Sequence, residues 1–142
     1  MNKILDGKKT SQRIKEEIKI KVDKLILEGY RAPHLAAILV GEDGASLTYV
    51  TNKVLSCKKV GFKSSLIRLP ESISENELLT EIQNLNINKE IDGFIVQLPL
   101  PNHINDEKVL LSVRADKDVD GFHPENFGRM ALNMESFIPA TP

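Results

Sequence analysis

Apolar residues recur along this chain in two alternating patterns, a helical spacing and short continuous runs. The first helical spacing covers residues 10–28, and Gly29 then suits the end of a helix. This pattern predicts an amphipathic helix. Its apolar face comprises Ile14, Ile18, Val22, Leu25 and Ile26.

The short apolar runs predict strands. Residues 35–40 are all apolar, which is typical of a strand that is covered on both faces in a parallel sheet, and Gly41 ends the run. Two further strands are predicted over residues 62–69 and 94–98.

Helical patterns lie between and after these strands. They cover residues 46–60 and 105–113, and Ser74 with Glu77 has the spacing of a capping box that opens a third such helix. Strands that alternate with helices predict parallel pairing through right-handed crossovers. The predicted fold is therefore an α/β fold, a three-layer domain with a mainly parallel sheet flanked by helices.

The length and the cysteine count limit the architecture. A chain of 142 residues is expected to form one domain, residues 1–142, which can bury roughly two thirds of the surface of its unfolded form. The single cysteine, Cys57, excludes an internal disulfide and fits a reducing compartment. The three histidines lie too far apart in sequence to suggest a local metal motif, so no metal is expected.

The charge distribution limits the class of partner. The net charge is -1 and both signs are mixed along the chain, so we expect no nucleic acid and no anionic membrane as partner. No apolar run approaches the roughly 20 residues that span a bilayer, and the first residues lack the apolar core of a signal peptide. A cytoplasmic protein with a small-molecule ligand is expected.

The candidate chemistry centres on Lys53. Lys53 follows Tyr49 by four residues and Ser46 by seven, so the three side chains lie on one face of the predicted helix. That helix follows the first strand, which places its opening turns at the carboxyl edge of the sheet, where Gln97 also lies. Near pH 7, a neutral lysine needs its pKa lowered by about three units, or roughly 4 kcal/mol, and an enclosed site could supply this.

Residues 114–136 are predicted to be largely irregular, with at most a short helix over residues 124–131. So long an irregular stretch is uncommon in a compact domain unless it has a function, and its Asp120 is a candidate ligand contact.

Simpler interpretations stay open for each residue. A tyrosine and a lysine four apart are most often a packed ring beside a solvated amine. Gln97 can end a strand by hydrogen bonding to the backbone, and Asp120 before Gly121 can form an Asx-type turn. Cys57 is interpreted as core packing.

Taken together, the motifs resemble the amino-terminal catalytic domain of the bifunctional methylenetetrahydrofolate dehydrogenase/methenyltetrahydrofolate cyclohydrolase family. The resemblance covers nearly the whole chain. Five ordered blocks carry it: VGED at 40–43 with AS at 45–46, YV at 49–50 with Lys53, GFIVQLPLP at 93–101, KDVDGF at 117–122 with GR at 128–129, and IPATP at 138–142.

The resemblance implies catalytic roles for three residues. Lys53 would handle the proton and the water in cyclohydrolysis, Gln97 would tune and position Lys53, and Tyr49 would stack on the folate. The implied reactions belong to one-carbon metabolism, which supplies purine and amino-acid biosynthesis. They are the NADP-dependent oxidation of methylenetetrahydrofolate and the hydrolysis of methenyltetrahydrofolate to formyltetrahydrofolate.

The resemblance also implies further substrate contacts. Asp120 would hydrogen-bond the pterin, Ser46 would join the wall of the pocket, and Leu98 and Pro99 would contact the tetrahydrofolate substrate. One pocket would serve both reactions.

The chain departs from the family pattern in two places. Gly44 stands where a proline is common, which loosens the turn before the helix. The family continues into a Rossmann domain that binds NADP, whereas this chain ends at Pro142 and contains no G-x-G-x-x-G motif. We therefore expect no cofactor site in this chain, no hydride transfer by the chain alone and only poor cyclohydrolysis. The intact protein is expected to be a homodimer and this chain a monomer.

Two alternative functions fit part of the sequence. Short-chain dehydrogenases also place a tyrosine four residues before a lysine, but the segment from Gly41 to Gly44 lacks the glycine spacing of their dinucleotide turn. The second alternative is a folate-binding fragment without catalysis of its own.

Overall fold

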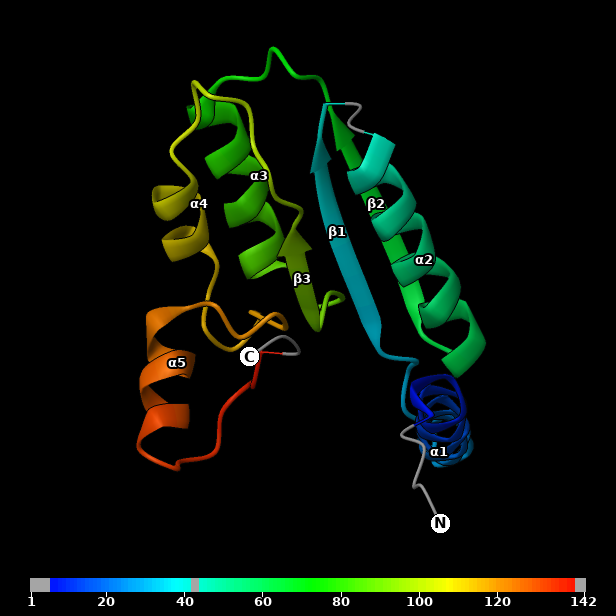
Figure 1. Cartoon of the computed structure of the whole chain (residues 1–142). Helices are drawn as coiled ribbons and strands as arrows, with labels where there is room; N and C mark the ends of the chain where they lie inside the picture. Colours follow the sequence, from blue (N-terminus) through cyan, green and yellow to red (C-terminus); the bar gives the residue numbers. More distant parts are fainter. Residues whose placement is uncertain (1–5, 42–43, 140–142) are drawn as a thin grey trace.

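The computed structural model describes residues 6–41 and 44–139. Two pairs of residues named in the sequence motifs, Glu42 with Asp43 and Thr141 with Pro142, lie outside these ranges, as does Ala140. The described strands form one sheet in the order β2-β1-β3, and their pairing is parallel, as predicted (Figure 1). The strands are β1 (His34–Val40), β2 (Lys63–Leu69) and β3 (Gly93–Val96).

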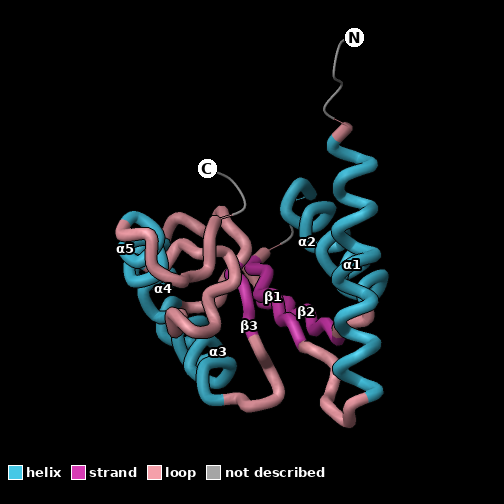
Figure 2. The backbone as a smooth tube through the Cα atoms, turned by 90° about the horizontal axis from the view of Figure 1, so that it is seen from below, coloured by secondary structure: helices cyan, strands magenta, loops and turns pink. Residues whose placement is uncertain are grey.

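Helices cover both faces of this sheet, which confirms the predicted α/β fold. The helices α3 and α4 lie on one face and α2 lies on the other, while α1 runs beside α2, away from the sheet (Figures 1 and 2). No helix in the described ranges is both long and apolar enough to cross a membrane. The helices are α1 (Gly7–Leu27), α2 (Gly44–Val60), α3 (Glu75–Ile87), α4 (Asp106–Ser112) and α5 (Pro124–Ala131).

The alternation of side chains along β1 divides the core into two parts. Ala36, Ile38 and Val40 contribute to the larger part, which α3 and α4 complete. Ala37 belongs to the smaller part, where Val50 of α2 is fully buried. Both faces of β1 are therefore covered, as its continuous apolar run predicted.

Local capping explains where two helices begin. Ser74 and Glu77 form the predicted capping box at the start of α3. Helix α1 begins at Gly7, earlier than predicted, because the Asp6 side chain accepts a hydrogen bond from the backbone N–H of Lys9. On the predicted apolar face of α1, only Val22 is fully buried, because this helix packs beside α2 and not on the sheet.

The third strand is shorter than predicted. It ends at Val96 and not at residue 98, although the backbone N–H of Gln97 still donates to the carbonyl of Ile38 at 2.9 Å. Pro99 follows through a cis peptide bond with Leu98, and a proline cannot donate to a neighbouring strand. The chain therefore leaves the sheet just where Gln97 reaches its carboxyl edge.

Candidate active site

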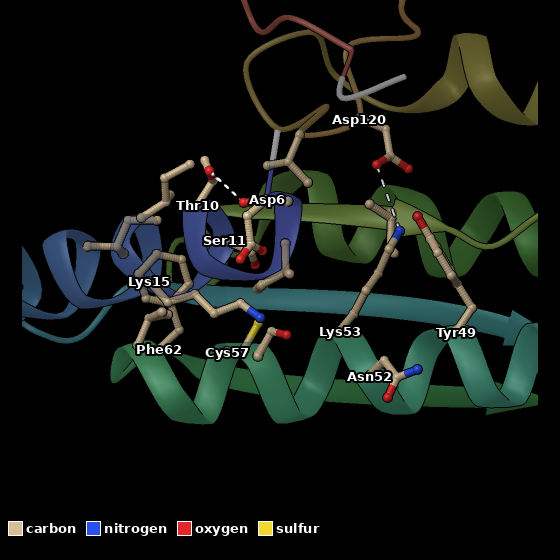
Figure 3. Close-up of a pocket in the computed structure, with 18 residues that line it drawn as sticks. Asp6, Thr10, Ser11, Lys15, Tyr49, Asn52, Lys53, Cys57, Phe62 and Asp120 are labelled. Carbon is tan, nitrogen blue, oxygen red and sulfur yellow. Dashed lines mark hydrogen bonds and ion pairs between the residues drawn. The ribbon is translucent and has the colours of Figure 1, made fainter. Parts of the chain in front are cut away.

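Tyr49 and Lys53 lie one turn apart on α2 and point away from the helix in the same direction (Figure 3). The Lys53 Nζ atom lies over the Tyr49 ring, 4.6 Å from its centroid. An amine at this distance is attracted to the ring face when it is protonated. The pair is thus in contact, in a geometry that the sequence spacing alone left undecided.

Asp120 faces this pair from the irregular segment that follows α4. Its Oδ1 atom lies 3.8 Å from Lys53 Nζ, which makes an ion pair that is too long for a hydrogen bond (Figure 3). Residues that lie 67 positions apart therefore form the two sides of one site.

A pocket of about 270 Å³ opens between these side chains at the carboxyl end of β3. It contains most of the predicted site. Its described lining is Tyr49, Lys53, Val96, Gln97, Leu98, Asp120 and Phe122.

A larger groove of about 1160 Å³ meets this pocket and shares Tyr49, Lys53 and Asp120 with it. The groove runs between α1 and α2, and the partly exposed Ile14 and Ile18 of α1 line it. The apolar face of the predicted amphipathic helix therefore lines this groove.

Burial dominates the electrostatics of the Lys53–Asp120 pair. It lowers the pKa of the Lys53 ammonium, although the Asp120 carboxylate opposes this change. Burial likewise raises the pKa of Asp120 against the effect of Lys53. Ion pairing alone would shift both pKa values in the opposite directions, so the loss of water outweighs the mutual attraction. Burial therefore shifts the pKa of each group in the direction that favours its uncharged form.

Gln97 offers an acceptor to a ligand. Its Nε2 atom donates to the Leu98 carbonyl at 2.8 Å, so the amide nitrogen is held by the backbone, as the simpler interpretation proposed. Its Oε1 atom is buried, with no hydrogen-bond partner in the described part of the chain. A buried amide oxygen without a partner is costly, and a substrate N–H, a water or an ammonium would relieve that cost.

The side chain that hydrogen-bonds into the turn at Gly121 is that of Asp118, three residues earlier, and not that of Asp120 as the simpler interpretation proposed. The Asp118 Oδ1 atom accepts from the Gly121 N–H at 3.1 Å. Gly121 has a φ of 71° and lies so close to Phe137 that a side chain there would overlap the Phe137 carbonyl oxygen. The side chain of Asp120 is therefore left to face Lys53.

Two predicted substrate contacts lie apart from the pocket. Ser46 is buried in the first turns of α2 and Pro99 is exposed, and neither is among the described residues that line the pocket. Their role as substrate contacts stays a prediction. The sequence analysis did not single out Val96 or Phe122, although both lie in the motif blocks at 93–101 and 117–122.

Among the described residues, no three His, Cys, Asp or Glu side chains are grouped to hold a metal ion. Cys57, interpreted as core packing, is buried and also lines the groove one turn after Lys53.

This chain is similar to known proteins over nearly its whole length. The family model "Tetrahydrofolate dehydrogenase/cyclohydrolase, catalytic domain" matches residues 5–120. The bifunctional protein FolD of Flavobacterium johnsoniae is 62% identical over 139 residues, which are 98% of this chain and 47% of that protein. The chain thus spans about half the length of the curated relatives it matches.

Two solved structures are similar over nearly the whole chain. A methylenetetrahydrofolate dehydrogenase of the silkworm Bombyx mori has a TM-score of 0.96 and 45% identity, over 99% of this chain and 49% of that one. A methylenetetrahydrofolate dehydrogenase-cyclohydrolase of Trypanosoma brucei, complexed with NADP cofactor and inhibitor, has a TM-score of 0.89 and 29% identity, over 96% of this chain and 47% of that one.

Proposed function

This chain belongs to the tetrahydrofolate dehydrogenase/cyclohydrolase family, and from that premise we propose that residues 1–142 form a catalytic domain that binds a reduced folate. The proposed activity of the whole enzyme is the oxidation of methylenetetrahydrofolate followed by hydrolysis of methenyltetrahydrofolate. The observation that carries the proposal is the lowered pKa of Lys53 in a pocket that also contains Gln97 and Asp120.

In the proposed hydrolysis, Lys53 acts on the attacking water. The substrate is a methenyl cation, and water forms a bond to its one-carbon bridge while the neutral Lys53 amine accepts a proton from that water. Ring opening then yields the formyl product. Cation plus water gives formyltetrahydrofolate plus one proton, and this proton leaves through the Lys53 ammonium.

The neighbouring side chains have complementary proposed roles. The free Oε1 atom of Gln97 accepts a hydrogen bond from the water or from Lys53 without adding a charge that would raise the pKa of the amine. Asp120, protonated or ionised, can hydrogen-bond the N–H groups of a pterin. Tyr49 presents an exposed ring on which an aromatic part of the substrate can stack.

The dehydrogenase step requires a dinucleotide as hydride acceptor. The turn from β1 into α2 contains Gly41 and Gly44 but not the glycine spacing that cradles a pyrophosphate. Hydride transfer is therefore proposed only for the whole enzyme. NADP as cofactor, and a homodimeric assembly, are proposals for the whole enzyme that rest on its family.

A cytoplasmic location and a role in supplying one-carbon units for purine and amino-acid biosynthesis complete the proposal. The single buried cysteine supports a reducing compartment.

The direct test mixes the chain with methenyltetrahydrofolate and follows the loss of its absorbance. We expect acceleration over buffer that disappears in Lys53→Met. Lys58→Met is the matched control, because Lys58 is an exposed lysine on the same helix that lines neither the pocket nor the groove. Binding without acceleration would support the folate-binding fragment instead, and equal loss in both variants would remove Lys53 from the mechanism.

A further inference from the structure

The buried carboxylate of Asp118 connects the residues on either side of Asp120. We propose that Asp118 is a positioning residue, which holds the Asp120 carboxylate opposite Lys53. This inference deepens the proposed function and rests on it for its catalytic meaning.

Asp118 accepts three hydrogen bonds. Its Oδ1 atom accepts from the Gly121 N–H at 3.1 Å, and its Oδ2 atom accepts from the His123 N–H at 2.8 Å. Both donors follow Asp120, whereas Asp118 precedes it. The carboxylate thus closes the backbone into a loop with Asp120 inside, and the exposed fraction of Asp118 is only 6%.

The third donor anchors this loop to α5. The Asn126 Nδ2 atom donates to Asp118 Oδ2 at 3.0 Å and to the Ala115 carbonyl at 2.8 Å. Asn126 is buried, with 4% exposed. One amide therefore connects the start of the loop, its carboxylate and the helix that follows it.

On its other side, the loop is attached to the sheet. The Phe94 N–H of β3 donates to the Lys117 carbonyl at 3.0 Å, and Phe94 and Asp118 form a parallel bridge. The sheet therefore fixes the backbone position of Asp118, and the hydrogen bonds of the Asp118 carboxylate hold the following backbone as far as His123. These contacts fix the position of Asp120. Lys53 is its only ion-pair partner among the described residues, and the Asp118 carboxylate acts on it through its charge.

An uncharged residue cannot replace this carboxylate fully. The three donors need two acceptor oxygens, but an asparagine has one oxygen and would turn an N–H toward at least one donor. Hydrogen bonds to a charged acceptor are also roughly twice as strong as neutral ones. Asp118→Asn should therefore loosen the loop while it preserves the size of the side chain.

A double-mutant cycle read at Lys53 tests the proposal. The Lys53 pKa is measured by NMR of its side chain in the wild type and in Asp120→Asn, Asp118→Asn and the double variant. Asp120→Asn should lower the Lys53 pKa, because a carboxylate that favours the ammonium is removed. In the Asp118→Asn background, the same substitution should produce less than about half of that shift, since Asp120 no longer stays beside Lys53.

Asn86→Ala is the matched background. Asn86 is another buried side chain with two hydrogen bonds to the backbone, to the Ser112 carbonyl and from the Arg114 N–H, and both of these partners precede Asp118 in the chain. In the Asn86→Ala background, Asp120→Asn should shift the Lys53 pKa as much as it does in the wild type. An equal shift in the wild-type and Asp118→Asn backgrounds would overturn the proposal, as would an equal reduction by Asn86→Ala. If Asp118→Asn fails to fold, Asn126→Ser takes its place in the cycle with the same two outcomes.

A second measurement, the affinity for folate, tests whether Asp118 affects the proposed substrate site. Asp118→Asn should weaken methenyltetrahydrofolate binding to an extent comparable with Asp120→Asn, and the double variant should be little weaker than either. If the wild-type chain binds no folate, the proposed function fails while the Lys53 cycle still decides the role of Asp118. If folate binds but the two losses simply add, Asp118 does not act through Asp120.

Discussion

Gly93 lies directly against the side chain of Val119, so closely that a Cβ atom at position 93 would overlap Cγ1 of Val119. The absence of a side chain at the first residue of β3 lets the segment that contains Asp118 and Asp120 approach the edge of the sheet. The bridge between Phe94 and Asp118 forms at this point. A contact with no chemistry of its own therefore helps to place a carboxylate opposite Lys53.

Gly93→Ala is expected to destabilise the chain by about 1–3 kcal/mol, because the branched Val119 side chain and the nearby Lys117 carbonyl must move. The measurement is urea-induced unfolding. Gly128→Ala is the matched control, since Gly128 lies inside α5 and an added Cβ would meet nothing within 4 Å. That variant should gain up to about 1 kcal/mol from helix propensity. Equal effects of the two substitutions would contradict the close approach.

Asp120→Asn should become more stable relative to the wild type as the pH rises. Burial raises the pKa of Asp120 above 3.8, so the folded chain holds this proton more tightly than the unfolded chain does. The stability that Asp120 contributes is therefore complete below pH 3.8 and is lost as the pH rises through the raised value. Unfolding of both proteins across this pH range measures the difference, and a gap that stays constant with pH would refute the burial argument.

The elements of the fold were largely predictable because their signals are local. The apolar run of β1, the capping box at Ser74 and the spacing of Tyr49 and Lys53 each depend on a few neighbouring residues. Parallel α/β sheets generally bind ligands at the carboxyl ends of their strands, so the sequence alone could place Gln97 near Lys53.

The parts that were not predicted depend on packing between distant segments. Nothing in the spacing of α1 indicates that it lies beside α2, so the exposure of Ile14 could not be anticipated. Two aspartates precede Gly121, and local turn chemistry could not decide which one forms the turn and which one faces Lys53. Contacts with other segments, the bridge to Phe94 and the amide of Asn126, distinguish Asp118 from Asp120.

Tyr49→Ala should weaken folate binding about tenfold or more, whereas Tyr49→Phe should change it only slightly, because a stacking surface needs the ring and not the hydroxyl. More than half of the Tyr49 side chain is exposed, so neither substitution should unfold the chain. Isothermal titration with methenyltetrahydrofolate provides the measurement. Tyr30→Ala removes a similarly exposed tyrosine that lines neither the pocket nor the groove, and it should have no effect. A large loss in Tyr49→Phe would point to the hydroxyl instead of stacking.

The Cys57 thiol should react slowly with an alkylating reagent in the folded chain. Cys57 is buried beside the groove, and burial raises the pKa of its thiol above 9.0, so both access and the thiolate fraction are reduced. Labelling at pH 7 should be at least about tenfold slower than in urea, where the thiol is exposed. Rapid labelling of the folded chain at neutral pH would show instead that α1 moves away from α2 and opens the groove, since α1 lines the side of the groove opposite Cys57.

The raised pKa of the Cys57 thiol also predicts a pH dependence of stability. Because the folded chain holds this proton more tightly than the unfolded chain does, stability should fall as the pH rises above 9.0, and Cys57→Ala should lack that part of the decline.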